Sequence, residues 1–141
     1  MNKLERAIAR LAQWRKANKG NTGGRCLAAC RLALADQGIR LPQSDVDYPG
    51  QFAITCFETL AANPGRWGWK QIHHNADGSW PMPYALVFFK QVGKLTSGLH
   101  KGQYAGHVAI LSVAQNKHFS NANYMLTPYW AAHLVGAFSP A

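Results

Sequence analysis

The first half of the chain has the apolar spacing of three helices. Over residues 2–17, apolar side chains recur every three or four positions opposite a basic side, which predicts a basic amphipathic helix. Its apolar stripe suits core packing, with binding to a membrane surface as the alternative. Residues 26–37 are almost continuously apolar and predict a central, buried helix that Gly38 ends as a C-cap and Pro42 prevents from continuing. A shorter helix is predicted over residues 51–62, before an Asn-Pro-Gly turn.

The second half has the pattern of strands separated by turns. Five β-rich stretches are predicted as strands, at residues 66–72, 84–92, 107–113, 117–124 and 133–139. Helices followed by an antiparallel sheet correspond to an α+β fold. The length of 141 residues suits a single domain, residues 1–141, which begins with the basic amphipathic helix in residues 1–18.

Composition indicates a globular protein rather than a disordered or membrane-spanning one. Hydrophobic residues make up 48% and charged residues 15%, and no apolar run approaches the roughly 20 residues of a membrane span. The charged N-terminus lacks the apolar core of a signal peptide, so we expect synthesis in the cytoplasm and export or release by another route. The formal net charge of +9 favours polyanionic partners: nucleic acid, anionic lipid or the bacterial cell wall. No recognisable nucleic-acid-binding motif is present.

The cysteines, histidines and acidic residues limit the chemistry. Three cysteines argue against a disulfide framework, and the spacing of Cys26 and Cys30 is not that of a zinc knuckle. The adjacent His73 and His74 are more typical of a solvated loop than of a metal site, so we expect no metal and no cofactor. No aspartate or glutamate lies in residues 78–141, so a site formed there must work without a carboxylate of its own.

Cys26 lies where a cysteine becomes nucleophilic. It follows a Gly-Gly-Arg segment at the start of a predicted helix, where free backbone N–H groups and the helix dipole favour the thiolate. The neighbouring Arg25 adds positive charge. Cys30, one helical turn further, and Cys56, inside the third predicted helix, are expected to be buried core residues.

A nucleophilic thiol needs a base, and His107 is the best candidate because it opens a predicted strand at the end of the sheet. The residue that orients the imidazole would be an asparagine, whose amide oxygen accepts a hydrogen bond from Nδ1–H. Asn121 and Asn123 lie on the next strand and point to one face. Pairing His107 with Asn121 centres the hairpin turn on Ala114. Pairing it with Asn123 moves the centre to Gln115.

The segment RCLAACRLALADQGI resembles the nucleophile helix of the NlpC/P60–CHAP superfamily of papain-like cysteine peptidases and amidases. In its amidase-like members a cysteine is followed by an apolar run, an arginine five residues on and a closing glycine. Cys26, Arg31 and Gly38 match those positions. GHVAIL, residues 106–111, is similar to the strand that carries the family's base. The resemblance covers residues 20–125.

Two further segments extend the resemblance. PMPYALVFF, residues 81–89, is similar to the family's P-x-P-G-D strand, although a Tyr-Ala pair replaces the Gly-Asp pair. HFSNANY, residues 118–124, falls where the family places its polar third residue, which favours Asn121 over Asn123. The resemblance implies a papain-like NlpC/P60-type fold in which N-terminal helices pack on an antiparallel sheet.

The resemblance also implies an activity, which is amide hydrolysis through a thioester at Cys26. His107 would be the base and Asn121 the orienting residue. The backbone N–H of Cys26 would donate to the oxyanion, and from its place in the preceding loop we expect the Asn21 side chain to support it. The implied substrate is bacterial peptidoglycan, cut by an endopeptidase or an N-acetylmuramoyl-L-alanine amidase at the cell wall. We expect a monomer. Aromatic candidates for a substrate groove are Trp67, Trp69, Trp80, Tyr84 and Tyr104.

Three interpretations of the sequence remain open. A phage lysin and a secreted amidase effector would share the same chemistry. The alternative from another class is a non-enzymatic basic module that binds nucleic acid or membrane through its positive charge.

Overall fold

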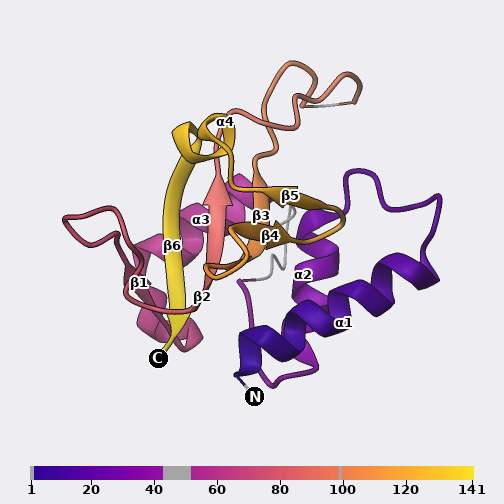
Figure 1. The fold of residues 1–141 in the computed structure, drawn as a ribbon. Coiled ribbons are helices and arrows are strands. Elements are labelled where there is room, and N and C mark those ends of the chain that lie inside the picture. Colours follow the sequence, from indigo (N-terminus) through magenta and orange to yellow (C-terminus); the bar gives the residue numbers. More distant parts are fainter. Residues whose placement is uncertain (1, 43–51, 99) are drawn as a thin grey trace.

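The computed structural model describes residues 2–42, 52–98 and 100–141. Six strands form one sheet in the order β1-β6-β2-β3-β4-β5, and each neighbouring pair is antiparallel (Figure 1). The strands are β1 (Trp69–Ile72), β2 (Tyr84–Phe89), β3 (His107–Ser112), β4 (Lys117–Phe119), β5 (Asn123–Met125) and β6 (Leu134–Pro140). The helices are α1 (Lys3–Ala17), α2 (Cys26–Ala35), α3 (Ala53–Ala62), α4 (Pro128–Ala132) and the 3₁₀ helix η1 (Pro64–Trp67). The predicted combination of helices with an antiparallel sheet is therefore confirmed for these residues.

Local side-chain and glycine chemistry sets the helix ends. The Asn2 side chain accepts a hydrogen bond from the Leu4 N–H at 2.7 Å and caps α1. Helix α2 ends at Ala35, two residues before the predicted end, and Gly38 then takes the left-handed conformation with φ 71°. Helix α3 begins two residues after its predicted start, and that start, Gln51, lies outside the described residues.

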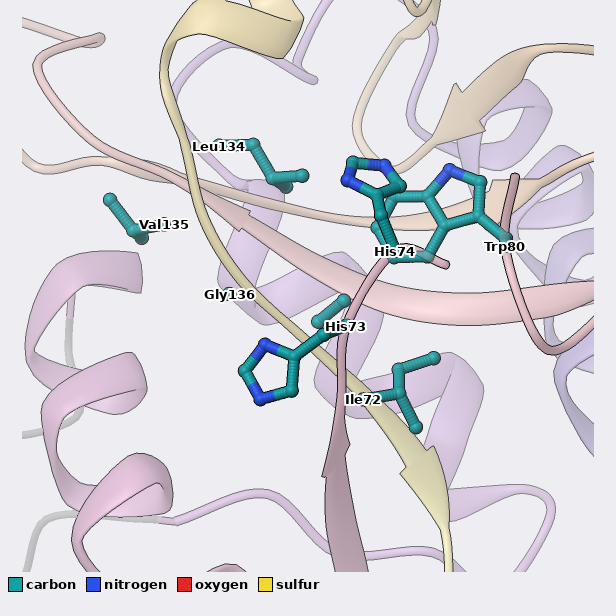
Figure 2. A pocket seen from close by; sticks show the side chains of 8 residues that line it. Ile72, His73, His74, Trp80, Leu134, Val135 and Gly136 are labelled. Carbon is teal, nitrogen blue, oxygen red and sulfur yellow. The ribbon is translucent and has the colours of Figure 1, made fainter. Parts of the chain in front are cut away.

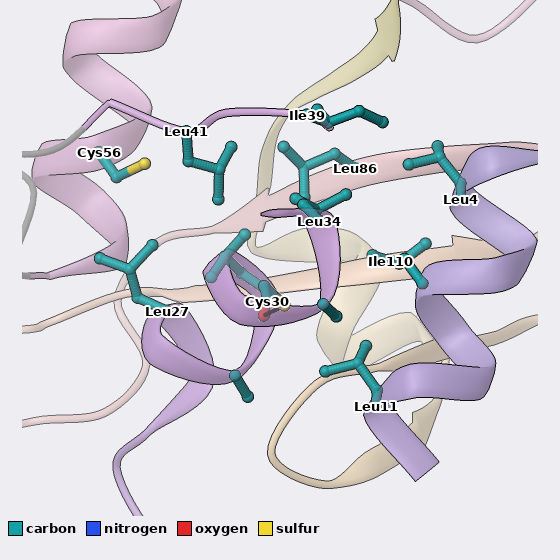
Figure 3. Close-up of a cluster of buried hydrophobic side chains, with 14 of the residues drawn as sticks. Leu4, Leu11, Leu27, Cys30, Leu34, Ile39, Leu41, Cys56, Leu86 and Ile110 are labelled. Atoms are coloured by element: carbon teal, nitrogen blue, oxygen red, sulfur yellow. Dashed lines mark hydrogen bonds between the residues drawn. The ribbon is translucent and has the colours of Figure 1, made fainter. Parts of the chain in front are cut away.

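Helices α1, α2 and α3 pack on one face of the sheet. Helices α1 and α2 contact each other and β3, and α3 contacts β2 and β3. Alternate residues of the central strands, such as Leu86 and Ile110, face these helices in a fully buried cluster (Figure 3). Cys30 and Cys56 belong to this cluster and are 0% exposed, so their predicted role as core residues is confirmed.

The other face of the sheet carries a second cluster, which includes Phe89 of β2 and Leu111 of β3. Partly buried side chains from the connecting segments and α4, such as Trp80 and Trp130, pack against it. The sequence pattern does not predict α4. Because β2 and β3 are buried on both faces, their sequences are continuous apolar runs instead of alternating ones.

Two predicted strands are shorter than expected because the backbone turns inside them. The predicted strand over residues 66–72 begins as η1, and Gly68, with φ 79°, turns the chain into β1 at Trp69. Strand β2 ends at Phe89 rather than at residue 92, and Gln91 then adopts a positive φ of 59°.

The β3–β4 hairpin corrects both predicted registers. Ile110 faces Phe119. A turn centred on Ala114 would pair Ile110 with residue 118, and a turn centred on Gln115 would pair it with residue 120, so the observed register lies one residue from each. The predicted strand over residues 117–124 is also divided, because β4 ends at Phe119 and β5 begins at residue 123. A one-residue change of register turns the side chains of a strand to the other face of the sheet, so this correction alters which residues can meet His107.

Candidate active site

A pocket of about 290 Å³ lies between the start of α2, the start of β3 and the turn that follows β4. Cys26, His107 and Asn121, three residues predicted from the sequence, all line this pocket. The other lining residues are Gly24, Phe52, Val92, Gly93, Leu95, Ala105, Gly106, Tyr124 and Trp130. Among the described residues this wall contains no lysine, arginine, aspartate or glutamate, so the pocket suits an uncharged part of a ligand.

Cys26 is the first residue of α2, and Gly24, with φ 69°, turns the chain into the helix. The residue is half-buried, and burial raises the pKa of the Cys26 thiol above its ordinary value. Backbone N–H groups of Val108, Leu27 and Cys26 itself lower the pKa, as a helix start predicts, but burial outweighs them. The expected thiolate is therefore corrected for the free protein, in which the resting side chain is a neutral thiol.

Arg25 does not bring positive charge to the thiol. Its guanidinium donates to Asn18 Oδ1 at 3.3 Å and to the Asn21 carbonyl at 3.1 Å, and it lies 5.0 Å from the centroid of the Trp14 ring. These contacts direct it to the end of α1. Asn21 is exposed and does not line the pocket, so the structure does not bring its side chain to the oxyanion position expected from the sequence.

His107 begins β3 and is 8% exposed. The ring centroids of Trp130 and His118 lie 5.1 and 5.8 Å from its own, and Phe89 and Tyr124 lie slightly further away. Burial, with a further contribution from His118, lowers the pKa of His107 to about 3. The imidazole is therefore neutral at physiological pH and keeps a lone pair on one of its two ring nitrogens.

His107 is connected to Asn121 through Ser120, which the sequence analysis did not name as a site residue. Ser120 Oγ lies 3.2 Å from His107 Nε2 and donates to Asn121 Oδ1 at 2.9 Å. Asn121 Nδ2 in turn donates to the Thr22 carbonyl at 3.0 Å, in the loop that leads to Cys26. Asn121 therefore does not bond the imidazole directly, and the nitrogen that is held is Nε2 rather than the expected Nδ1.

The hairpin register explains why Ser120 takes this position. His118 faces Leu111, which lies on the same face of β3 as His107. Ser120 follows His118 by two residues and shares that face, where it is 0% exposed. Asn123 is exposed in β5 and does not line the pocket. Identifying Ser120 therefore requires the hairpin register, for which the sequence of the turn carries no strong signal.

The aromatic residues expected to line a substrate groove lie elsewhere. Trp69 is buried in the main core, and Trp67 and Tyr84 pack against that core. Tyr104 is exposed, and Trp80 lines a different pocket. The aromatic residues that do line the pocket of Cys26 are Phe52, Tyr124 and Trp130.

A second pocket, of about 180 Å³, includes His73, His74 and Trp80 in its wall (Figure 2). The His74 ring lies against Trp80 with ring centroids 3.9 Å apart and the two planes tilted by 56°. No group of three or more histidine, cysteine, aspartate or glutamate side chains in the described ranges is arranged to hold a metal ion. The two histidines thus contribute to an aromatic wall, and no third ligand accompanies them among these residues.

None of the helices in the described part of the chain is long and apolar enough to cross a membrane. Comparison with known proteins found no matching family model, no matching curated protein and no matching solved structure. The geometry of the pocket and the motifs in the sequence are therefore what indicates a function for this chain.

Proposed function

We propose that the chain is a cysteine-dependent peptidoglycan hydrolase, an endopeptidase or an N-acetylmuramoyl-L-alanine amidase of the phage-lysin kind. One observation carries this proposal. A cysteine at the start of α2, a histidine at the start of β3 and an asparagine in the turn after β4 line one pocket, although the cysteine is far from the other two in the sequence. The backbone of Val108, the residue directly after His107, is among the groups that lower the pKa of the Cys26 thiol, so the nucleophile lies close to the start of the strand that bears the base.

The neutral state of both Cys26 and His107 determines the first chemical step. As the sulfur attacks the substrate carbonyl carbon, the S–H proton passes to the imidazole and the carbonyl electron pair moves to oxygen. The N–H groups in the first turn of α2 have no partner within the helix, and they stabilise the oxyanion. Collapse of the tetrahedral intermediate expels the amine, which takes the proton from the imidazolium and leaves a thioester on Cys26.

Water then completes the cycle. The imidazole of His107 takes a proton from the water molecule as its oxygen attacks the thioester carbon. The C–S bond breaks, the sulfur regains the proton, and the acyl product leaves as a carboxylic acid. No charged group is formed in the pocket before the substrate arrives, because the thiol and the imidazole exchange a proton only during attack.

The nature of the pocket and of the surface supports the choice of substrate. The pocket wall has no ionisable side chain other than Cys26, His107 and Tyr124 among the described residues, and it carries Phe52 and Trp130, which suits a backbone amide beside a small apolar group such as an alanine methyl. The net charge of +9 favours approach to an anionic cell envelope. The resemblance of the motifs to NlpC/P60–CHAP hydrolases points to the same substrate.

The proposal is tested by digesting purified sacculi and identifying the released fragments by mass spectrometry. The wild type is expected to release fragments with one new amine and one new carboxylate, and their masses name the bond that is cut. Cys26→Ala should release none, whereas Asn123→Ala, an exposed change outside the pocket, should match the wild type. A folded wild type that releases nothing, but binds DNA or anionic vesicles with steep salt dependence, would support the basic binding module instead.

A further inference from the structure

We propose that Ser120 is a positioning residue that holds His107 as the Nε2–H tautomer, so that Nδ1 is the nitrogen that exchanges protons with Cys26. The catalytic part of this inference rests on the proposed function. The tautomer itself is a property of the folded chain and is measurable without any substrate.

The orientation of the Asn121 amide is fixed by the backbone of the loop before Cys26. The Thr22 carbonyl can only accept a hydrogen bond, so the group 3.0 Å from it must be the NH₂ of Asn121. The other end of the amide, Oδ1, therefore faces Ser120. The Thr22 backbone thus fixes which of the two similar ends of this side chain meets the hydroxyl.

The orientation of Asn121 then determines where the hydroxyl proton of Ser120 lies. Oδ1 of Asn121 is an acceptor only, and it lies 2.9 Å from Ser120 Oγ, so the hydroxyl donates its single proton there. Only lone pairs of Ser120 Oγ remain for the contact with His107 Nε2 at 3.2 Å. A bond across that contact requires that Nε2 carries the proton.

The opposite tautomer of His107 would place two lone pairs against each other in a buried site. Ser120 is 0% exposed and His107 is 8% exposed, so water does not readily compensate for such a contact. The pKa of His107, lowered to about 3, means that one nitrogen keeps its lone pair at neutral pH. Since Nε2 is protonated, that nitrogen is Nδ1, which makes no hydrogen bond to any described residue.

The backbone around Ser120 is held on both sides. Arg15 of α1 donates to the Ser120 carbonyl at 3.0 Å, and the Ser120 N–H donates to the Ala122 carbonyl at 3.0 Å. The hydroxyl is therefore presented to the imidazole from a constrained segment. Because Nε2–H donates to Ser120 whether or not Nδ1 is protonated, His107 can accept and release a proton without rearranging this contact.

The direct test is nuclear magnetic resonance on protein labelled with ¹⁵N in the histidine rings. Long-range ¹H–¹⁵N correlation spectra at neutral pH distinguish the two tautomers, and His107→Gln identifies the signals of His107 by their loss. We expect the wild type to show only the Nε2–H form. A predominant Nδ1–H form in the wild type would overturn the proposal, whatever the activity of the protein.

Variants then test the role of the Ser120 hydroxyl. Ser120→Ala should give a mixture of tautomers and lower kcat by about 10-fold or more with little change in KM, because the base is populated in the wrong form. Ser120→Thr retains a hydroxyl and should restore most of both properties. Ser139→Ala is the matched control, since Ser139 is 2% exposed and its hydroxyl bonds only to the neighbouring Pro140 carbonyl, away from His107.

The outcomes separate this inference from the proposed function. If Ser120→Ala folds and leaves both the tautomer and kcat unchanged, Ser120 is not a positioning residue. If Ser120→Ala does not fold, the wild-type spectrum and the Ser120→Thr variant still decide the proposal. A wild type that shows the Nε2–H tautomer but no hydrolysis would keep the tautomer assignment and refute the enzymatic function.

Discussion

Gly106, directly before the candidate base, is a residue whose replacement the structure opposes in two ways, through its backbone conformation and through the atoms around it. Its φ is 75°, a conformation that side chains rarely adopt. A Cβ atom at this position would lie 2.9 Å from the Phe89 carbonyl oxygen and 3.0 Å from the Ile54 backbone nitrogen. Both neighbours are backbone atoms, in β2 and α3, so they cannot move aside as a flexible side chain would.

Two costs therefore add in Gly106→Ala. Left-handed backbone costs a residue with a side chain about 1–2 kcal/mol. Forcing the methyl group against fixed atoms costs about 1–3 kcal/mol more. We expect the free energy of unfolding to fall by roughly 2–5 kcal/mol in total. Alanine also restricts the unfolded chain more than glycine does, which offsets a small part of this loss.

Gly102→Ala is the matched control for the backbone part. Gly102 has a similar φ of 87°, but nothing lies within 4 Å of its added Cβ. Guanidinium unfolding followed by circular dichroism gives the free energy of unfolding of each variant. The effect of alanine on the unfolded chain is the same in both variants and cancels in the comparison. We expect Gly106→Ala to lose about 1–3 kcal/mol more than Gly102→Ala. Equal losses would show that the methyl group fits beside His107 and that the crowding argument is incorrect.

Three further predictions follow from buried and paired groups. Burial lowers the pKa of His118 to about 4 from an ordinary 6.5, so the unfolded chain binds that proton first and stability falls as the pH drops from 6.5 to 4. In unfolding curves measured between pH 6.5 and pH 4, His118→Phe should remove the contribution of His118 to this loss of stability, which is on the order of 3 kcal/mol. If the free energy of unfolding depends on pH equally in the variant and the wild type, this prediction is contradicted. Iodoacetamide should label Cys26 before Cys30, because Cys30 is fully buried. The labelling rate of Cys26 should still rise above pH 8, because the pKa of its thiol is raised. Peptide mapping that finds Cys30 labelled first would exclude Cys26 as the nucleophile. The partly exposed ion pair of Arg10 and Asp36, 2.6 Å apart, should couple by less than about 1 kcal/mol in a double-mutant cycle, and stronger coupling would indicate an interaction that the structure lacks.

The sequence was sufficient to predict the elements whose signals are local. The apolar spacing identified α1, and the apolar run with a terminal glycine identified α2 and its left-handed Gly38. The continuous apolar runs identified β2 and β3. Local signals also indicate Cys26 and His107, because helix starts and strand ends are recognisable from nearby residues, whereas Asn121 is favoured over Asn123 by the family resemblance; all three line one pocket.

Features that depend on packing were predicted poorly. The turn between β3 and β4 has no strong sequence signal, and a change of one residue in its register exchanged the expected Asn121 contact for one from Ser120. Helix α4 is five residues long and its role is to cover the sheet, so its own sequence shows little periodicity. Arg25 turned away because its partners, Asn18 and Trp14, come from the preceding helix.

The protonation state of Cys26 shows most clearly why local reasoning was incomplete. The position at a helix start does favour the thiolate, and the backbone groups at the start of α2 lower the pKa as expected. The competing effect is desolvation, which depends on side chains from other parts of the chain, such as Phe52 and Trp130, that close around the pocket. The same burial keeps His107 neutral. The nucleophile and the base therefore rest in forms that hold no charge, and the free N–H groups of α2 remain available for the charge that develops on the substrate oxygen during attack.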